Sequence, residues 1–162
     1  MNTLESVKQI EKAIQFIHTI PIKEMTFPLV RKIIHILIEN HYDNEAFDIL
    51  KKLSENNFNV EAGIFSVVIN EFFERKDYRA AEKLIHYVST MNVPPTVDYY
   101  NCLVSNYANL GDFAKITDLF GSMMENKVSP NIVTNNIIQR FQLGSYWAAA
   151  GELLNKNEEK VE

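Results

Sequence analysis

The side chains that most often carry catalysis or bind metals show no productive spacing in this chain. Cys102 is the only cysteine, which excludes an intramolecular disulfide and a cysteine-based metal site, and no base is evident beside it. The four histidines, His18, His35, His41 and His86, lack metal-ligand spacing. The acidic residues fall mainly at the starts and outer faces of predicted helices. The sequence therefore predicts a non-catalytic protein with no metal and no cofactor.

Amide side chains recur instead, at matched places in two segments. Asn101 lies in NVPPTVDYYNCLV (92–104), and Asn136 lies in KVSPNIVTNNIIQ (127–139). The segments also share Val93 with Val128, Pro95 with Pro130, Val97 with Ile132, and Leu103 with Ile138, each pair 35 residues apart. An amide both donates and accepts hydrogen bonds, and near a helix start it can satisfy free backbone N–H groups. Hydrogen bonding, rather than bond making, is the chemistry that this pattern offers.

The spacing of 35 residues extends beyond these two segments. Shifting the sequence by that interval aligns residues 27–61, 62–96 and 97–131 without a gap, and residues 132–162 form a partial or capping repeat. Residues 3–26 precede the repeats as a lone helix and a joint. Because each repeat of such an array packs mainly on its neighbours, we expect one helical-repeat domain over residues 1–162.

Apolar residues at spacings of three and four predict two helices in each repeat. The first helices are expected at about 28–40, 63–75, 98–109 and 133–142, and the second at about 44–56, 78–90 and 113–126. A further helix is expected over 3–19. Asp77 and Asp112 are candidate N-caps, and Gly111 and Gly144 are candidates for the left-handed residue that ends a first helix. The sequence thus predicts an all-α fold.

Composition limits the class of partner. The net charge is −5 and the isoelectric point is about 5.4, which is not the basic balance typical of nucleic-acid binding. No apolar run approaches the roughly 18 residues of a membrane span. The N-terminal stretch MNTLESVKQIEKAIQF contains acids and no arginine, which is not typical of a signal or transit peptide.

The third repeat, VDYYNCLVSNYANLGDFAKITDLFGSMMENKVSPN, resembles the pentatricopeptide repeat family. The similarity covers residues 27–157 and is most specific in residues 97–131. The matching residues are Tyr100, Asn101 and Leu103; Gly111 before the second helix; Leu119, Phe120 and Met123; and Val128, Pro130 and Asn131 at the close. The resemblance implies a right-handed α-solenoid of antiparallel hairpins, here about three and a half repeats.

The resemblance also implies binding of single-stranded RNA, one base for each repeat. The bases would be recognised by the pairs Ser66 with Thr96 and Asn101 with Asn131, and by Asn136 in the last repeat. The two asparagines resemble a family pair that favours pyrimidines. Val133 would stack on a base, and Arg31, Lys32 and His35 are candidates for phosphate contacts. The residues themselves leave other roles open: a local structural role for Asn101 and Asn136, and a solvated face for the basic residues.

Two functions follow from these observations. The family resemblance implies a non-catalytic RNA-binding module acting in organellar RNA processing, stability or translation, with localisation in a mitochondrion or other organelle. The alternative is a protein-interaction scaffold, or a subunit of a larger ribonucleoprotein assembly, with little RNA affinity of its own. Glu39 and Glu74 favour the alternative, because they stand where the family tends to place lysine.

Overall fold

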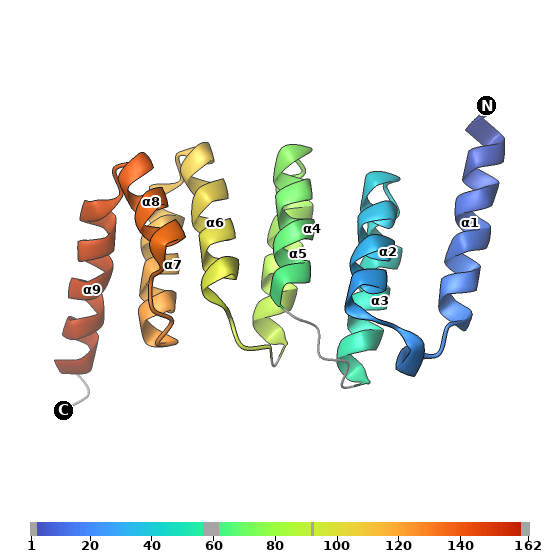
Figure 1. The fold of residues 1–162 in the computed structure, drawn as a ribbon. Helices are drawn as coiled ribbons and strands as arrows, with labels where there is room; N and C mark the ends of the chain where they lie inside the picture. Colours follow the sequence, from blue (N-terminus) through green and yellow to red (C-terminus); the bar gives the residue numbers. More distant parts are fainter. Residues whose placement is uncertain (1–2, 57–61, 92, 160–162) are drawn as a thin grey trace. The chain divides into compact units, whose positions relative to one another are not determined.

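The computed structural model describes residues 3–56, 62–91 and 93–159 (Figure 1). The chain divides into two compact units, residues 1–60 and residues 61–162, which are described separately. Every regular element in the described residues is helical, so the predicted all-α helical-repeat fold is confirmed. None of the described helices combines the length and apolar character that crossing a membrane requires.

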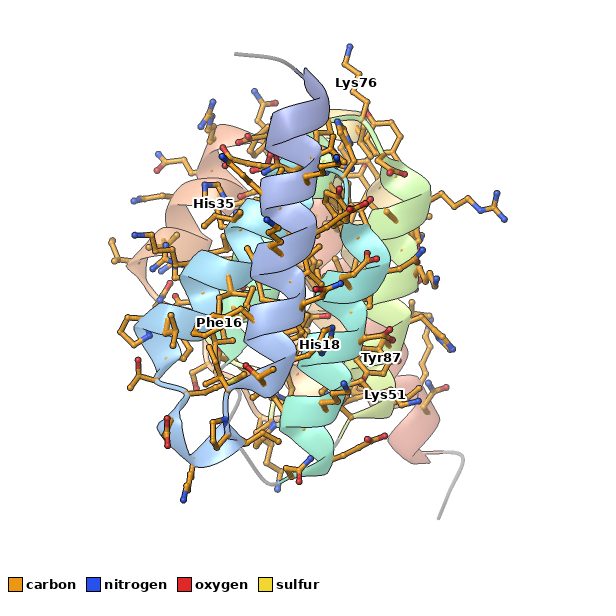
Figure 2. All side chains as sticks on the ribbon, turned by 90° about the vertical axis from the view of Figure 1, so that its right-hand side faces the viewer. Phe16, His18, His35, Lys51, Lys76 and Tyr87 are labelled. Carbon is orange, nitrogen blue, oxygen red and sulfur yellow. The ribbon has the colours of Figure 1, made fainter. Side chains whose placement is uncertain are left out.

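The first unit contains a lone helix, a 3-10 turn and one helical hairpin. Its elements are α1 (Thr3–Thr19), η1 (Ile22–Glu24), α2 (Phe27–Glu39) and α3 (Asp43–Glu55). Helix α1 has the predicted bounds. Its His18, labelled in Figure 2, has Nδ1 3.3 Å from Lys52 Nζ of α3. Phe16, also labelled in Figure 2, is 68% exposed. The hairpin α2–α3 holds the buried core of this unit.

The second unit contains three hairpins. They are formed by α4 (Ala62–Glu74) with α5 (Tyr78–Thr90), α6 (Val97–Leu110) with α7 (Phe113–Glu125), and α8 (Ile132–Arg140) with α9 (Gly144–Glu159). Their first helices begin at residues 62, 97 and 132, at the predicted interval of 35. Within this unit α6 packs against both α4 and α8, so the first helices of successive hairpins are neighbours.

The apolar stripes predicted from the sequence form the cores. The first helices bury Val30, Ile33, Ile34 and Leu37 in α2; Phe65, Val68, Ile69 and Phe72 in α4; and Tyr100, Leu103, Val104 and Tyr107 in α6. In the second helices, Ala46 and Ala81 are at most 1% exposed. Small side chains at these positions let the two helices of a hairpin approach closely.

The ends of the helices follow local chemistry that repeats with the hairpins. Asp77 accepts a hydrogen bond from the Ala80 backbone N–H, and Asp112 accepts one from Lys115, both at 3.2 Å. Both predicted N-caps are therefore confirmed. Each satisfies a backbone donor at a helix start that has no partner within the helix.

Each first helix is followed within two residues by one in the left-handed conformation. These residues are His41, Lys76, Gly111 and Gln142, with φ between 56° and 75°. The next backbone N–H in the chain bonds back five residues, as in Asp112 to the Tyr107 carbonyl at 3.0 Å. The prediction was right for Gly111 and wrong for Gly144, which is the first residue of α9. Because α8 stops at Arg140, the turn falls two residues earlier, on Gln142.

A charged cluster joins the hairpin α4–α5 to the hairpin α6–α7. Glu82 of α5 accepts hydrogen bonds from Lys115 Nζ of α7 and from the Tyr107 hydroxyl of α6, the latter at 2.5 Å. The Lys115 ammonium also lies 5.0 Å from the centre of the Tyr107 ring. Partial burial opposes ionisation of Glu82, but the hydrogen bonds and the Lys115 charge outweigh it and lower the pKa of Glu82.

This cluster predicts an acid-sensitive contribution to stability. A carboxyl group with a lowered pKa stabilises the fold above its unfolded pKa of about 4.3, and that contribution is lost as the pH falls through the folded pKa. We expect Glu82→Gln to lower the urea midpoint at pH 7, and the difference from wild type to shrink at pH 3. Urea unfolding at both pH values measures this, with the exposed Glu125→Gln as control. An equal difference at both pH values would contradict the prediction.

Candidate functional site

The first helices of the second unit carry a line of amide and hydroxyl side chains. Between α4 and α6, Asn106 Nδ2 donates to Asn70 Oδ1 at 2.6 Å. The Cys102 thiol lies 3.2 Å from the same oxygen and 3.5 Å from the Ser66 carbonyl. Burial raises the pKa of Cys102 to about 12. The thiol therefore stays protonated at neutral pH and serves as a weak donor between helices.

Between α6 and α8 the line continues as a closed network of three side chains. Asn101 Nδ2 donates to Asn131 Oδ1 at 3.2 Å, and the Thr134 hydroxyl donates to Asn101 Oδ1 at 2.8 Å. Asn131 is the N-cap of α8 and accepts from the Thr134 backbone N–H at 3.0 Å. The Asn131 N–H donates to Thr134 Oγ1 at 3.1 Å, which completes a reciprocal capping box.

The orientation of both amides follows from this network. A backbone N–H can only donate, so the oxygen of Asn131 must face Thr134 and its NH₂ group must face away. Asn101 donates to that oxygen, which leaves its own oxygen for the Thr134 hydroxyl. Within the described residues the NH₂ group of Asn131 has no hydrogen-bond acceptor. Because no buried side-chain nitrogen in the described residues lacks a partner, this NH₂ group is open to solvent.

Burial differs sharply between the two asparagines of this pair. Asn101 is 6% exposed, whereas Asn131 is half-buried at the start of α8. The structure therefore brings the predicted pair together, and both of its members also hold α6 against α8. Asn101 has its oxygen and one of its N–H groups engaged. Asn131 is the member of the pair whose two side-chain N–H groups remain available to a ligand.

The other predicted pair has a related arrangement. Thr96 is the exposed N-cap of α6 and accepts from the Tyr99 backbone N–H at 3.3 Å. Ser66 is half-buried on α4, where its carbonyl faces the Cys102 thiol. The last residue of each of these repeats is thus the N-cap of the next first helix.

The remaining predicted residues lie apart from the network. Asn136 and Val133 are exposed on α8, Val133 to 47%, and Asn136 stands one repeat after Asn101. Arg31, Lys32 and His35 are exposed on α2, in the first unit; His35 Nε2 lies 3.7 Å from Glu39 (Figure 2). Glu61, which aligns with Asn131 in the first repeat, is outside the described residues.

Exposed charges on the first helices of the second unit are of both signs. Glu74 ends α4 and Asp98 lies in the first turn of α6, both exposed. Arg140 ends α8 and is exposed as well. The two carboxylates weaken the attraction of this surface for phosphate groups.

Thr134 is the residue of the network that the sequence analysis missed. It is 2% exposed and bonds to both asparagines. The sequence did contain a local indication of this role. Thr134 stands three residues after the N-cap Asn131, which is the spacing of a capping box. Its bond to Asn101, 33 residues away, could not be inferred without the packing of α6 on α8.

Comparison with known proteins supports the family resemblance. A family model described as pentatricopeptide repeat domain matches residues 48–110 and residues 102–141. The two matches span residues 48–141, which is more than half of the 162 residues. No curated protein matches the chain.

The network predicts that the Thr134 hydroxyl contributes to stability. Thr134→Val keeps the shape of the side chain but leaves the Asn101 oxygen and the Asn131 N–H without their partner. We expect a loss of about 1–3 kcal/mol in the free energy of unfolding, the usual cost of unsatisfied buried polar groups. Urea unfolding measures it. The control Thr90→Val, at an exposed site, should change stability by less than about 0.5 kcal/mol; equal effects would contradict the prediction.

Proposed function

The chain belongs to the pentatricopeptide repeat family, and on that premise we propose that it binds single-stranded RNA without catalysing a reaction. The proposed setting is organellar, such as a mitochondrion, in RNA processing, stability or translation. The observation that carries the proposal is the pair formed by Asn101 and Asn131, whose network turns two N–H donors of Asn131 outward.

The chemistry of the pair indicates which bases fit. In a single strand the base edges are free for hydrogen bonding. Uracil offers two carbonyl oxygens there, and cytosine offers a carbonyl oxygen and a ring nitrogen, all of which accept hydrogen bonds. The NH₂ group of Asn131 can donate to these acceptors. Purines also present acceptors, so the proposed preference for pyrimidines rests on the family pair that Asn101 and Asn131 resemble. Val133 and Asn136 supply an exposed apolar side chain and a further amide on α8, for an adjacent base.

Phosphate contacts are proposed to be few. Arg140 on α8 and the exposed Arg31, Lys32 and His35 on α2 are the candidate partners for the backbone. Within the second unit, Glu74 and Asp98 oppose Arg140. Because each phosphate contact adds affinity that salt removes, RNA binding by this chain should be modest and should depend weakly on salt.

A second candidate function is a scaffold within a larger ribonucleoprotein assembly. The specific observation in its favour is the acid on the first helices, Glu74 and Asp98, together with a net charge of −5. Such a surface suits a basic protein segment better than it suits a phosphate backbone. In that case the amide network would serve only to join hairpins.

Asn136 offers the cleanest test of RNA recognition. It is exposed and its side chain forms no hydrogen bond within the described residues, so Asn136→Ala should leave stability unchanged. We expect the wild type to bind oligo-uridine about tenfold more tightly than oligo-adenosine at low salt, and Asn136→Ala to weaken oligo-uridine binding several-fold, the worth of one hydrogen bond.

Gel-shift titration measures these affinities, with the neighbouring Asn135→Ala as a matched control. Asn135 is also exposed on α8 but stands at the position of Tyr100, not of Asn101. Binding weaker than about 1 mM to every RNA, or equal losses from Asn135→Ala and Asn136→Ala, would count against the proposal.

Glu74 distinguishes the two functions. If the surface formed by α4, α6 and α8 binds RNA, Glu74→Gln removes a negative charge that repels phosphate groups. This change should raise the affinity for RNA about two- to fivefold at low salt. Glu152→Gln makes the same change in net charge on α9 and should have a smaller effect. If the surface binds a basic protein segment instead, Glu74→Gln will leave RNA affinity unchanged.

A further inference from the structure

The proline joint before α6 encloses a cavity that the RNA proposal does not use. Its volume is about 480 Å³, and it lies within the second unit, between the end of α5, residues 93–95, the first turns of α6 and the last turns of α7. Val88, Pro95, Leu103 and Leu119 form apolar walls. Pockets of about 300–1,000 Å³ with such walls and a few polar groups are typical small-molecule sites.

The polar group that singles out this cavity is the Tyr99 hydroxyl. Tyr99 lines the cavity and is 7% exposed, and its ring packs against Tyr100 with the ring centres 6.0 Å apart. Within the described residues the Tyr99 hydroxyl has no hydrogen-bond partner. The backbone N–H of Tyr99, by contrast, donates to the Thr96 side chain. No buried side-chain oxygen in the described residues lacks a partner, so this hydroxyl is open to solvent, and a ligand would take the place of water there.

A second donor lies close in the same wall. The Tyr100 hydroxyl accepts from Asn126 Nδ2 at 3.1 Å, so its own proton is free to be donated. Burial raises the pKa of Tyr99, which keeps that phenol protonated and a donor at neutral pH. The cavity therefore presents two phenolic donors beside apolar walls.

The following repeat shows that the open hydroxyl is not a requirement of the fold. Thr134 stands 35 residues after Tyr99, and its hydroxyl is engaged by Asn101 and Asn131. The same position of the hairpin therefore accepts a side chain whose polar atoms are fully paired. Tyr99 lines the cavity instead, and its hydroxyl is left for water or a ligand to pair.

The charge of the lining limits the class of ligand. Among the described residues that line the cavity, none carries a charge at neutral pH. An ion would lose its hydration there without a compensating partner. We propose that this joint cavity binds an uncharged, largely apolar small molecule whose carbonyl oxygen accepts a hydrogen bond from Tyr99. This proposal is independent of RNA binding.

Three matched probes test the chemistry on the whole chain. They are 1-indanone, the hydrocarbon indane, which lacks the carbonyl, and indane-2-carboxylate, which carries a charge. NMR titration of the ¹⁵N-labelled protein should show 1-indanone binding with a Kd on the order of 1 mM, a usual value for a ligand of this size. Indane should bind about tenfold more weakly, the worth of one hydrogen bond, and the carboxylate should not bind.

Two variants locate the site. Tyr99→Phe keeps the ring and removes the hydroxyl, so it should abolish the preference for 1-indanone over indane. Ser89→Phe should block the cavity from its rim, because Ser89 is exposed and lines it. Thr90→Phe is the control: Thr90 is also exposed, does not line the cavity, and, like Ser89, bonds to a carbonyl of its own helix.

The proposal is overturned if neither neutral probe binds the wild type, or if indane and 1-indanone bind equally. It is also overturned if Tyr99→Phe retains the preference, or if Ser89→Phe and Thr90→Phe behave alike. The comparison of probes on the wild type needs no variant, so a variant that fails to fold leaves the test intact.

Discussion

The second unit depends on one constraint: a two-helix hairpin has two apolar faces and can bury only part of them by itself. Phe72, Phe120 and Leu103 are almost fully buried because α4, α6 and α7 pack within and between hairpins. In the hairpins α4–α5 and α6–α7 that packing is repeated with the same turn, whereas α8 is shorter and turns earlier. The left-handed residues Lys76 and Gly111 and the N-caps Asp77 and Asp112 form these two matching turns.

Hydrogen bonds between side chains then fix the position of one first helix along its neighbour. Apolar packing is not directional, but the bonds from Asn101 to Asn131 and Thr134, and from Asn106 to Asn70, have fixed donors and acceptors. The α6–α8 network has a consequence for function as well. By using the Asn131 oxygen as a helix cap, it holds the NH₂ group of the same residue toward solvent, already oriented for a ligand. Structural and recognition roles of the pair are therefore compatible.

The sequence was sufficient for the repeat and for the helices, because a 35-residue period with apolar spacings of three and four is a local signal. The helix starts at 27, 62, 97 and 132 were each predicted to within one residue. The turn at Gln142 was missed because the left-handed position depends on where α8 stops, not only on where glycine stands. Thr134 and the cavity at Tyr99 were missed because both depend on contacts between residues more than 20 apart. The candidate pair itself was anticipated through family resemblance.

The central claim is that Asn131 presents its NH₂ group to a pyrimidine while its oxygen remains the cap of α8. The side-chain NH₂ resonances of Asn131, observed by NMR in the ¹⁵N-labelled chain during titration with short RNA, test it most directly. The account predicts that oligo-uridine shifts these resonances and that oligo-adenosine at the same concentration does not, while the Thr134 backbone amide changes little. Unchanged Asn131 resonances in the presence of bound oligo-uridine would contradict it.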